Sequence, residues 1–323
     1  MVKGYEKDLY PGIVKMLEDE GYVVRREFTL SPGAGADSRD VDAMGFRWDA
    51  EGNLDAWAVE AKDGDTPRRV LAALPQAIEY GLVAPQVSIA ARIPADHLAY
   101  ATDPLRLLGI GYINAGSTRA TSALPPRRAE RWPNSDLSRW LRHAGVLCVL
   151  TKELRPAVDA EWRTHTSARP DGSTHYAVHT EEPVQIGFSA KSNPGEVSAV
   201  VWAEQKAKVR RILESLDAAR LHAAMGQAGV HGQISKRERS PWGPLKPAKE
   251  SRPIGESATE TEKALTWARR VLRGDRVIPV LAIRSPLWAF DALPDRAMAT
   301  KAVADAMAKL APIRAVLKDA LSA

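Results

Sequence analysis

Acidic and basic side chains with a spacing suited to catalysis occur in a segment that reads as a β-hairpin. Glu60 and Lys62 are two residues apart, so on a strand both side chains point to the same face. Asp42 lies on the preceding predicted strand, and the numbers 42 and 60 sum to 102, which places their midpoint at residue 51, inside the predicted turn. Asp42 and Glu60 should therefore lie nearly opposite each other, with their side chains close together.

Two adjacent carboxylates and a lysine indicate hydrolysis assisted by a divalent cation. Neighbouring carboxylates repel each other unless a positive charge lies between them, and Mg²⁺ suits one or two carboxylates together with phosphate. The lysine could orient or help deprotonate a water and offset the charge that develops on a phosphorus centre. The alternative is an ordinary Glu–Lys pair on an exposed sheet face. Asp40 is a rival for Asp42 because residues two apart on a strand share a face; the hairpin register favours Asp42.

The elements that must position these residues follow one another as a helix, three strands, a helix, a strand, a helix and a strand. Apolar residues at helical spacing predict a helix over residues 3–21. The hairpin comprises predicted strands over 41–48 and 54–62. An antiparallel hairpin followed by helical crossovers predicts a mixed sheet, and hence an α/β fold, for residues 1–115.

This pattern resembles the PD-(D/E)XK nuclease superfamily, which includes restriction endonucleases, Holliday-junction resolvases and methylation-dependent restriction enzymes. The resemblance covers residues 1–115. It is carried by Glu6 on the first helix, Asp42 on its strand, Glu60-Ala61-Lys62 on the next strand and Gln76 on the following helix. It implies a restriction-endonuclease-like mixed-sheet core with flanking helices as a catalytic domain.

Carried over residue by residue, the resemblance assigns roles to the same side chains. Asp42 and Glu60 would bind the metal, Mg²⁺ or Mn²⁺, and Glu6 would help to hold this ion or a second one. Lys62 would be the catalytic lysine, and Gln76 would position water or substrate.

The chain after residue 115 differs in composition. Residues 116–136 contain Pro and Arg repeatedly and read as a basic linker. Residues 137–323 read as an α+β domain of unassigned fold that recognises DNA or a partner. The first 115 residues hold 12 Lys/Arg and 18 Asp/Glu (12 − 18 = −6), whereas the rest hold 33 and 22 (33 − 22 = +11). This charge asymmetry favours a polyanionic partner for the basic part.

The most basic stretch, residues 236–252, encloses an aromatic residue. Lys236, Arg237 and Arg239 precede Trp242. Lysine and arginine suit phosphate contacts, and an aromatic ring can stack on a base, so these four residues are the candidates for nucleic-acid binding. The alternative is a flexible, solvated loop.

Composition excludes several classes of protein. No apolar run approaches the roughly 18 residues that a membrane span needs. The single cysteine, Cys148, excludes a disulfide scaffold and a cysteine-rich zinc module. The first ten residues contain four charged side chains and offer no apolar signal-peptide core, so a cytoplasmic location is expected.

Together these features predict a Mg²⁺-dependent nuclease that hydrolyses phosphodiester bonds of DNA, with restriction of foreign or modified DNA as its role. Two alternatives remain: a nuclease of DNA repair or recombination, and a non-catalytic nucleic-acid-binding module on a degenerate nuclease fold. The sequence leaves open a homodimer and a partner ATPase or methyltransferase.

Overall fold

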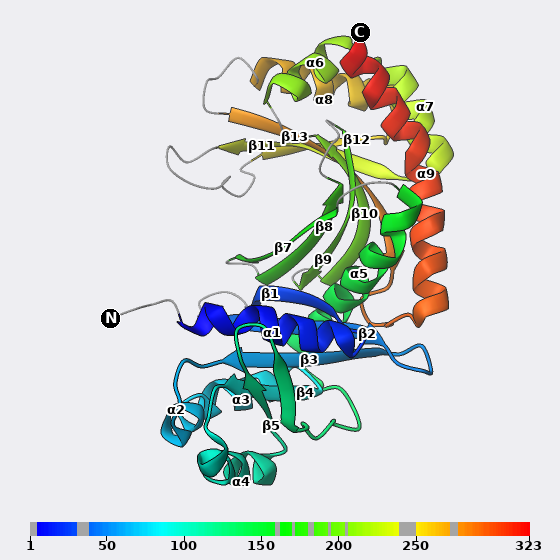
Figure 1. Ribbon diagram of the computed structural model, residues 1–323. Helices are drawn as coiled ribbons and strands as arrows, with labels where there is room; N and C mark the ends of the chain where they lie inside the picture. Colours follow the sequence, from blue (N-terminus) through cyan, green and yellow to red (C-terminus); the bar gives the residue numbers. More distant parts are fainter. Residues whose placement is uncertain are drawn as a thin grey trace.

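The computed structural model describes residues 5–30, 39–158, 162–169, 172–179, 184–192, 195–203, 206–238, 250–271 and 277–323. Within these ranges the chain forms a mixed sheet of six strands and a separate antiparallel sheet of seven, with helices packed on both (Figure 1). No helix in these ranges is long and apolar enough to cross a membrane.

The first sheet follows chain order from β1 to β6. The first three strands pair antiparallel, the third to fifth pair parallel, and the sixth returns antiparallel beside the fifth. The predicted mixed sheet is therefore confirmed. Its strands are β1 (Val23–Leu30), β2 (Arg39–Trp48), β3 (Leu54–Ala61), β4 (Gln86–Ala91), β5 (Gly111–Ala115) and β6 (Ala120–Leu124).

Helices cover both faces of this sheet, which explains why every residue of β3 and β4 is buried. On one face α1 (Tyr5–Asp19) packs its apolar stripe, including Ile13 and Leu17, against β2, β3 and β5. The other face carries short helices that connect the parallel strands. They are α2 (Pro67–Leu71), α3 (Leu74–Gly81), the 3₁₀ turn Ala95–His97 and α4 (Leu98–Leu108).

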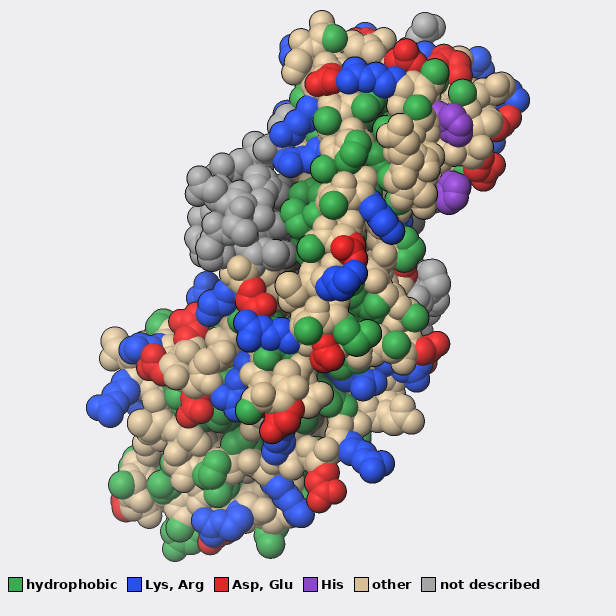
Figure 2. Space-filling model, turned by 90° about the vertical axis from the view of Figure 1, so that its right-hand side faces the viewer, with side chains coloured by type: hydrophobic (Ala, Val, Ile, Leu, Met, Phe, Trp, Pro, Cys, Tyr) green, Lys and Arg blue, Asp and Glu red, His purple; other side chains and the backbone are tan. Residues whose placement is uncertain are grey.

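The second sheet has the order β12-β11-β13-β10-β9-β8-β7 and is antiparallel throughout. Its strands are β7 (Trp162–Arg169), β8 (Gly172–His179), β9 (Gln185–Ser192), β10 (Gly195–Ala203), β11 (His231–Glu238), β12 (Glu250–Ile254) and β13 (Val277–Trp288). The helices around it are α5 (Asp136–Val158), α6 (Lys206–Ser215), α7 (Ala218–Ala228), α8 (Ala258–Val271) and α9 (Arg296–Ser322). On the face of the molecule that Figure 2 shows, basic and acidic side chains are interspersed.

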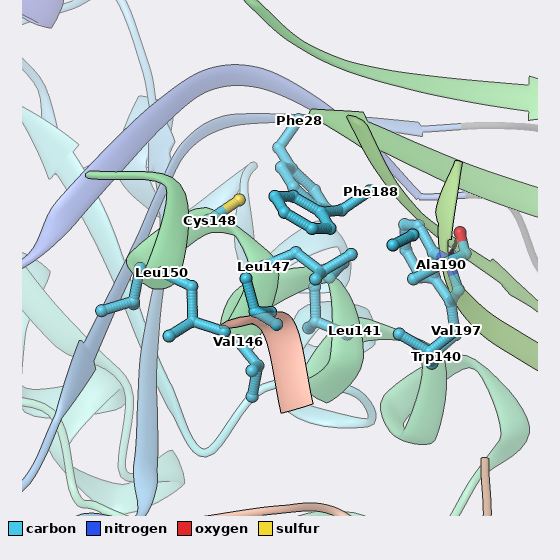
Figure 3. Close-up of a cluster of buried hydrophobic side chains, with 14 of the residues drawn as sticks. Phe28, Trp140, Leu141, Val146, Leu147, Cys148, Leu150, Phe188, Ala190 and Val197 are labelled. Atoms are coloured by element: carbon cyan, nitrogen blue, oxygen red, sulfur yellow. Dashed lines mark hydrogen bonds between the residues drawn. The ribbon is translucent and has the colours of Figure 1, made fainter. Parts of the chain in front are cut away.

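Helix α5 lies between the two sheets and contributes to both. It packs on β1, β2 and β3 of the first sheet and on β8 and β9 of the second. Figure 3 shows its apolar side chains meeting Phe28 from one sheet and Phe188 from the other. The Trp140 ring lies 5.9 Å from that of Phe28, and its indole N–H donates a 3.1 Å hydrogen bond to the carbonyl of Ala190. One hydrophobic core therefore extends from the first sheet to the second, and a separate cluster lies under α1.

The structure differs from the sequence-based elements beyond residue 115. Residues 120–124, assigned to the linker, form β6 and extend the first sheet. The sequence pattern predicts only a short helix over residues 137–143, but α5 continues to Val158. The content of Pro, Gly and charged residues predicts an irregular stretch over 226–257, but residues 231–238 form β11, which pairs with β12 on one side and β13 on the other. The α+β character of residues 137–323 agrees with the expectation.

Candidate active site

The hairpin of β2 and β3 has the register that the residue numbers predict. Pairs run from Ala43 opposite Val59 to Trp48 opposite Leu54, and each pair sums to 102 (43 + 59; 48 + 54). Asp42 and Glu60 occupy the next position, at the open end of the hairpin. There a side chain, in place of a backbone carbonyl, bonds the neighbouring strand. The Oδ2 atom of Asp42 accepts a 2.7 Å hydrogen bond from the backbone N–H of Ala61.

Asp42 is also held by helix α1. The hydroxyl of Tyr10 donates a 2.5 Å hydrogen bond to Asp42 Oδ1, so both carboxylate oxygens have a donor from a different element. Burial raises the pKa of Asp42 above the usual value of an aspartate, and these two hydrogen bonds oppose the rise without cancelling it. The carboxylate is therefore fixed in position. Its two hydrogen bonds offset only part of the free energy that its charge loses on removal from water.

Glu60 is almost fully buried and is likewise held at both oxygens. Lys62 forms an ion pair and hydrogen bond with Oε1, and the hydroxyl of Tyr80 on α3 donates a 2.9 Å hydrogen bond to Oε2. Burial raises the pKa of Glu60, and the negative charge of Asp42 raises it further. This effect of one carboxylate on the other shows that the two charges are close enough to interact, as expected from the hairpin.

Lys62 is a cation at neutral pH. Burial by itself lowers the pKa of its ammonium group, but the hydrogen bond and charge of Glu60 outweigh burial and raise it. The charges of Glu6 and Asp42 act in the same direction. The lysine is thus a fixed positive charge between acidic groups.

Gln76 reaches the site through another side chain. Its amide N–H donates a 3.2 Å hydrogen bond to the hydroxyl of Tyr80, which in turn bonds Glu60. Gln76 and Tyr80 are four residues apart on α3 and therefore share a face. In this arrangement Gln76 orients the tyrosine, whereas the sequence predicts that it positions water or substrate.

Glu6 and Asp40 lie at the margin of the cluster. Glu6 makes no hydrogen bond or ion pair within the described ranges, but its negative charge adds to the rise in the pKa of Asp42. Asp40 is exposed, and its carboxylate accepts a 2.6 Å hydrogen bond from the hydroxyl of Thr29 on β1. The structure therefore brings together Asp42, Glu60 and Lys62, with Glu6 nearby, and leaves the Asp40 carboxylate with a partner outside the cluster.

Two tyrosines were missed by the sequence analysis. Tyr10 and Tyr80 each donate to one carboxylate of the pair. Both follow a predicted site residue by four positions, since Tyr10 follows Glu6 on α1 and Tyr80 follows Gln76 on α3. Helical spacing of four places such residues on one face, and this signal could have identified both.

The residues fit a hard divalent cation. Each carboxylate oxygen has two acceptor positions, so the four donors described above leave one position free on each oxygen. Two buried carboxylates with raised pKa values are destabilised by their own charges, which a cation would neutralise. Among the described residues, no group of three or more His, Cys, Asp or Glu is placed to hold a metal by protein ligands alone. An ion held by Asp42 and Glu60 would therefore need water or another ligand to complete its coordination, as Mg²⁺ commonly does.

The predicted nucleic-acid contacts are described only in part. Lys236 lies on β11, where its ammonium group is 3.9 Å from the carboxylate of Glu250 on β12. Arg237 pairs through its backbone with Ile278 of β13. Arg239 and Trp242 lie outside the described residues. The role of these four residues stays a prediction.

Comparisons with known proteins identify no relative: no family model, no curated protein and no solved structure matches the chain.

Proposed function

We propose that the protein is a metal-dependent nuclease that hydrolyses phosphodiester bonds of DNA. The observation that carries the proposal is the pairing of two buried carboxylates, Asp42 and Glu60, with a charged lysine at the open end of one hairpin. Carboxylates at this spacing suit Mg²⁺ or Mn²⁺, which when bound neutralises the charge on phosphate and favours formation of the attacking hydroxide.

In this proposal the carboxylates, the tyrosines and the lysine of the site have different roles. Asp42 and Glu60 would hold the ion, and Tyr10 and Tyr80 would keep their oxygens in place. Lys62 would offset the charge that develops on the phosphate as water adds to phosphorus and a bond to an ester oxygen breaks. Because the pKa of Lys62 is raised, the lysine suits charge stabilisation better than removal of a proton from water.

The mixed sheet supports the same proposal. The order of its elements and the location of the site at the end of an antiparallel hairpin agree with the PD-(D/E)XK resemblance. The proposed role is restriction of foreign or modified DNA, with repair or recombination as the second candidate. A non-catalytic binding module is less well supported, because such a module has no need of two carboxylates buried at a cost in stability.

Replacing Lys62 with alanine tests the proposal directly. We expect K62A to lose cleavage of supercoiled plasmid in Mg²⁺ or Mn²⁺ by roughly 10²–10³-fold, the usual effect of removing one preorganised charge from a transition state. The matched control is K15A, which removes an exposed lysine paired with Asp19 on the outer side of α1. Equal cleavage by K62A and the parent would refute the assignment of Lys62. An inactive parent in both metals would favour the binding module.

A further inference from the structure

The second sheet is covered by helices on one face only. Helix α5 packs on β8 and β9, α9 on β10 and β13, and α8 on β11 and β12. Alternate residues that point to these helices form the core, for example Phe188, Val201 and Ile283. Figure 1 shows the helices on the outer side of the curved sheet, and no helix of the described ranges lies on its inner side. The inner face is called the open face below.

At its centre, on β9, β10 and β13, the open face carries a cluster of polar and charged side chains beside the buried Val200 and Ala282. Ser189 pairs with Ser198 and Lys191 with Glu196 across β9 and β10. The two serine hydroxyls are 3.2 Å apart at the base of the cluster, and the Lys191 ammonium is 3.5 Å from Glu196 Oε2. From β13, Arg284 Nη1 lies 3.3 Å from Glu196 Oε1. Two cations therefore share one carboxylate, and the cluster has a net positive charge.

The arginine of this cluster keeps donors for a ligand. All of its hydrogen bonds within the described ranges come from Nη1 and are long, at 3.3–3.4 Å. Its Nε and Nη2 groups make none there, and 26% of its side chain is exposed. Burial alone raises the pKa of Glu196, but the charges of Arg284 and Lys191 outweigh it and hold that pKa below its usual value. The carboxylate thus stays charged and orients the two cations.

The described charges of the open face favour an anionic partner. Lys191 and Arg284 outnumber Glu196 there (2 − 1 = +1), whereas Arg252 lies on the helix-covered face. Strands about 4.8 Å apart make a seven-stranded sheet about 29 Å wide, close to one turn of B-DNA, about 34 Å. Duplex DNA has one negative charge per ~1.7 Å of this length, so a surface of this width faces many phosphates.

The open face and the candidate active site lie on the same side of the molecule. In Figure 1 the turn of the β2–β3 hairpin is at the right, so its open end, with Asp42 and Glu60, is at the left beside the start of α1. The open face of the second sheet also looks to the left. A duplex on this face would therefore extend toward the carboxylates without passing around the molecule.

We propose that the open face of the β7–β13 sheet, with Lys191 and Arg284 at its centre, binds the phosphate backbone of the duplex DNA on which the candidate active site acts. This inference rests on the proposed nuclease function and gives it a substrate-binding surface. Since the contacts are to phosphate, the surface contributes affinity and orientation and reads no base sequence.

Substitutions of opposite sign test the proposal in the full chain. Binding of a fluorescein-labelled 30-base-pair duplex is followed by anisotropy in EDTA over a range of salt concentrations. Loss of both cations in K191Q/R284Q should weaken binding and lower the slope of log affinity against log salt by about 1.8, or 0.9 for each phosphate contact. E196Q removes the competing carboxylate and should tighten binding. R252Q, on the helix-covered face above Trp267, is the matched control and should bind like the parent.

The outcomes separate the surface from the nuclease activity. If K191Q/R284Q and E196Q both weaken binding, the cluster only maintains the fold and the proposal is overturned. If the parent cleaves plasmid but K191Q/R284Q keeps the parental affinity and slope, the surface proposal fails and the nuclease proposal stands. If the parent neither binds nor cleaves duplex DNA, both proposals fail. Parental DNA binding by K62A together with weakened binding by K191Q/R284Q supports the assignment.

Discussion

The carboxylates of Asp40 and Asp42 are two residues apart on β2, but they have different surroundings. Asp40 is exposed and bonds Thr29, whereas Asp42 is bonded by Tyr10 and by the backbone of Ala61 next to Glu60. Strand alternation makes the two rivals because it assigns them the same face, and in the sequence only the hairpin register favours Asp42. In the structure α1 adds a second distinction, because its Tyr10 bonds Asp42, and strand periodicity gives no sign of this contact.

Metal binding distinguishes the two aspartates by experiment. A cation that binds only the folded protein stabilises it by RT ln(1 + [L]/Kd), about 2.7 kcal/mol at a concentration one hundred times the Kd. For a chain of 323 residues, whose unfolding entropy is about 2.1 cal/mol/K per residue, we expect Mg²⁺ or Mn²⁺ to raise the melting temperature by roughly 4 °C. D42N should lose most of this increase, because an amide replaces a charged oxygen ligand, and D40N should keep it. Differential scanning fluorimetry with and without metal measures both. An increase lost in D40N and kept in D42N would reverse the assignment.

At the scale of elements, the β2–β3 hairpin was predictable and α5 was not. A short turn fixes the register of a hairpin, so residue numbers alone place Asp42 opposite Glu60. Helix α5 lacks an amphipathic pattern because both sheets pack on it, and Trp140, Leu147 and Cys148 are all buried. A helix that is apolar all round shows no periodicity, so the run over 146–150 gives no sign of a continuing helix.

Gly145 allows α5 to approach the hairpin closely. A Cβ at this position would lie 2.5 Å from Cδ1 of Phe46 and 2.9 Å from Cδ2 of Leu54. We expect G145A to destabilise the protein by roughly 1–3 kcal/mol, because the added methyl group overpacks the core. Guanidinium unfolding followed by circular dichroism measures the change.

The matched control for this position is G226A on α7, where a Cβ would meet nothing within 4 Å. There the better helix propensity of alanine should stabilise the protein by roughly 0.5–1 kcal/mol. Equal stabilisation by G145A and G226A would contradict the close packing of α5 on the first sheet.

At the scale of the whole molecule, the boundary expected near residue 115 does not coincide with a break in the core. The first sheet needs β6, α5 and the segment between them. The Trp132 indole donates a 3.2 Å hydrogen bond to the carbonyl of Leu54, and Phe28 packs on Trp140. Composition and charge change near residue 115, but hydrophobic contacts across that point are visible only in three dimensions. The sequence therefore predicts the first five strands of this sheet, but it does not predict that β6 extends the sheet or that α5 covers one face.

A chain truncated after residue 117 should consequently fail to fold, although it contains every predicted catalytic residue. It would lose β6 and α5 and expose the face formed by residues such as Met44 and Phe46, which are fully buried in the whole protein. We expect this fragment to lack a cooperative thermal transition and near-ultraviolet circular dichroism, whereas the full chain shows both. A fragment ending at residue 158 retains α5 and should recover part of the near-ultraviolet signal, with apolar surface left exposed where β8 and β9 are missing. A cooperative melt of the 117-residue fragment would contradict the shared core.

If the fragment fails to fold as expected, DNA binding and cleavage cannot be separated by cutting the chain near residue 117. Substitutions in the full protein, such as K62A and K191Q/R284Q, are then the way to assign each activity to its sheet.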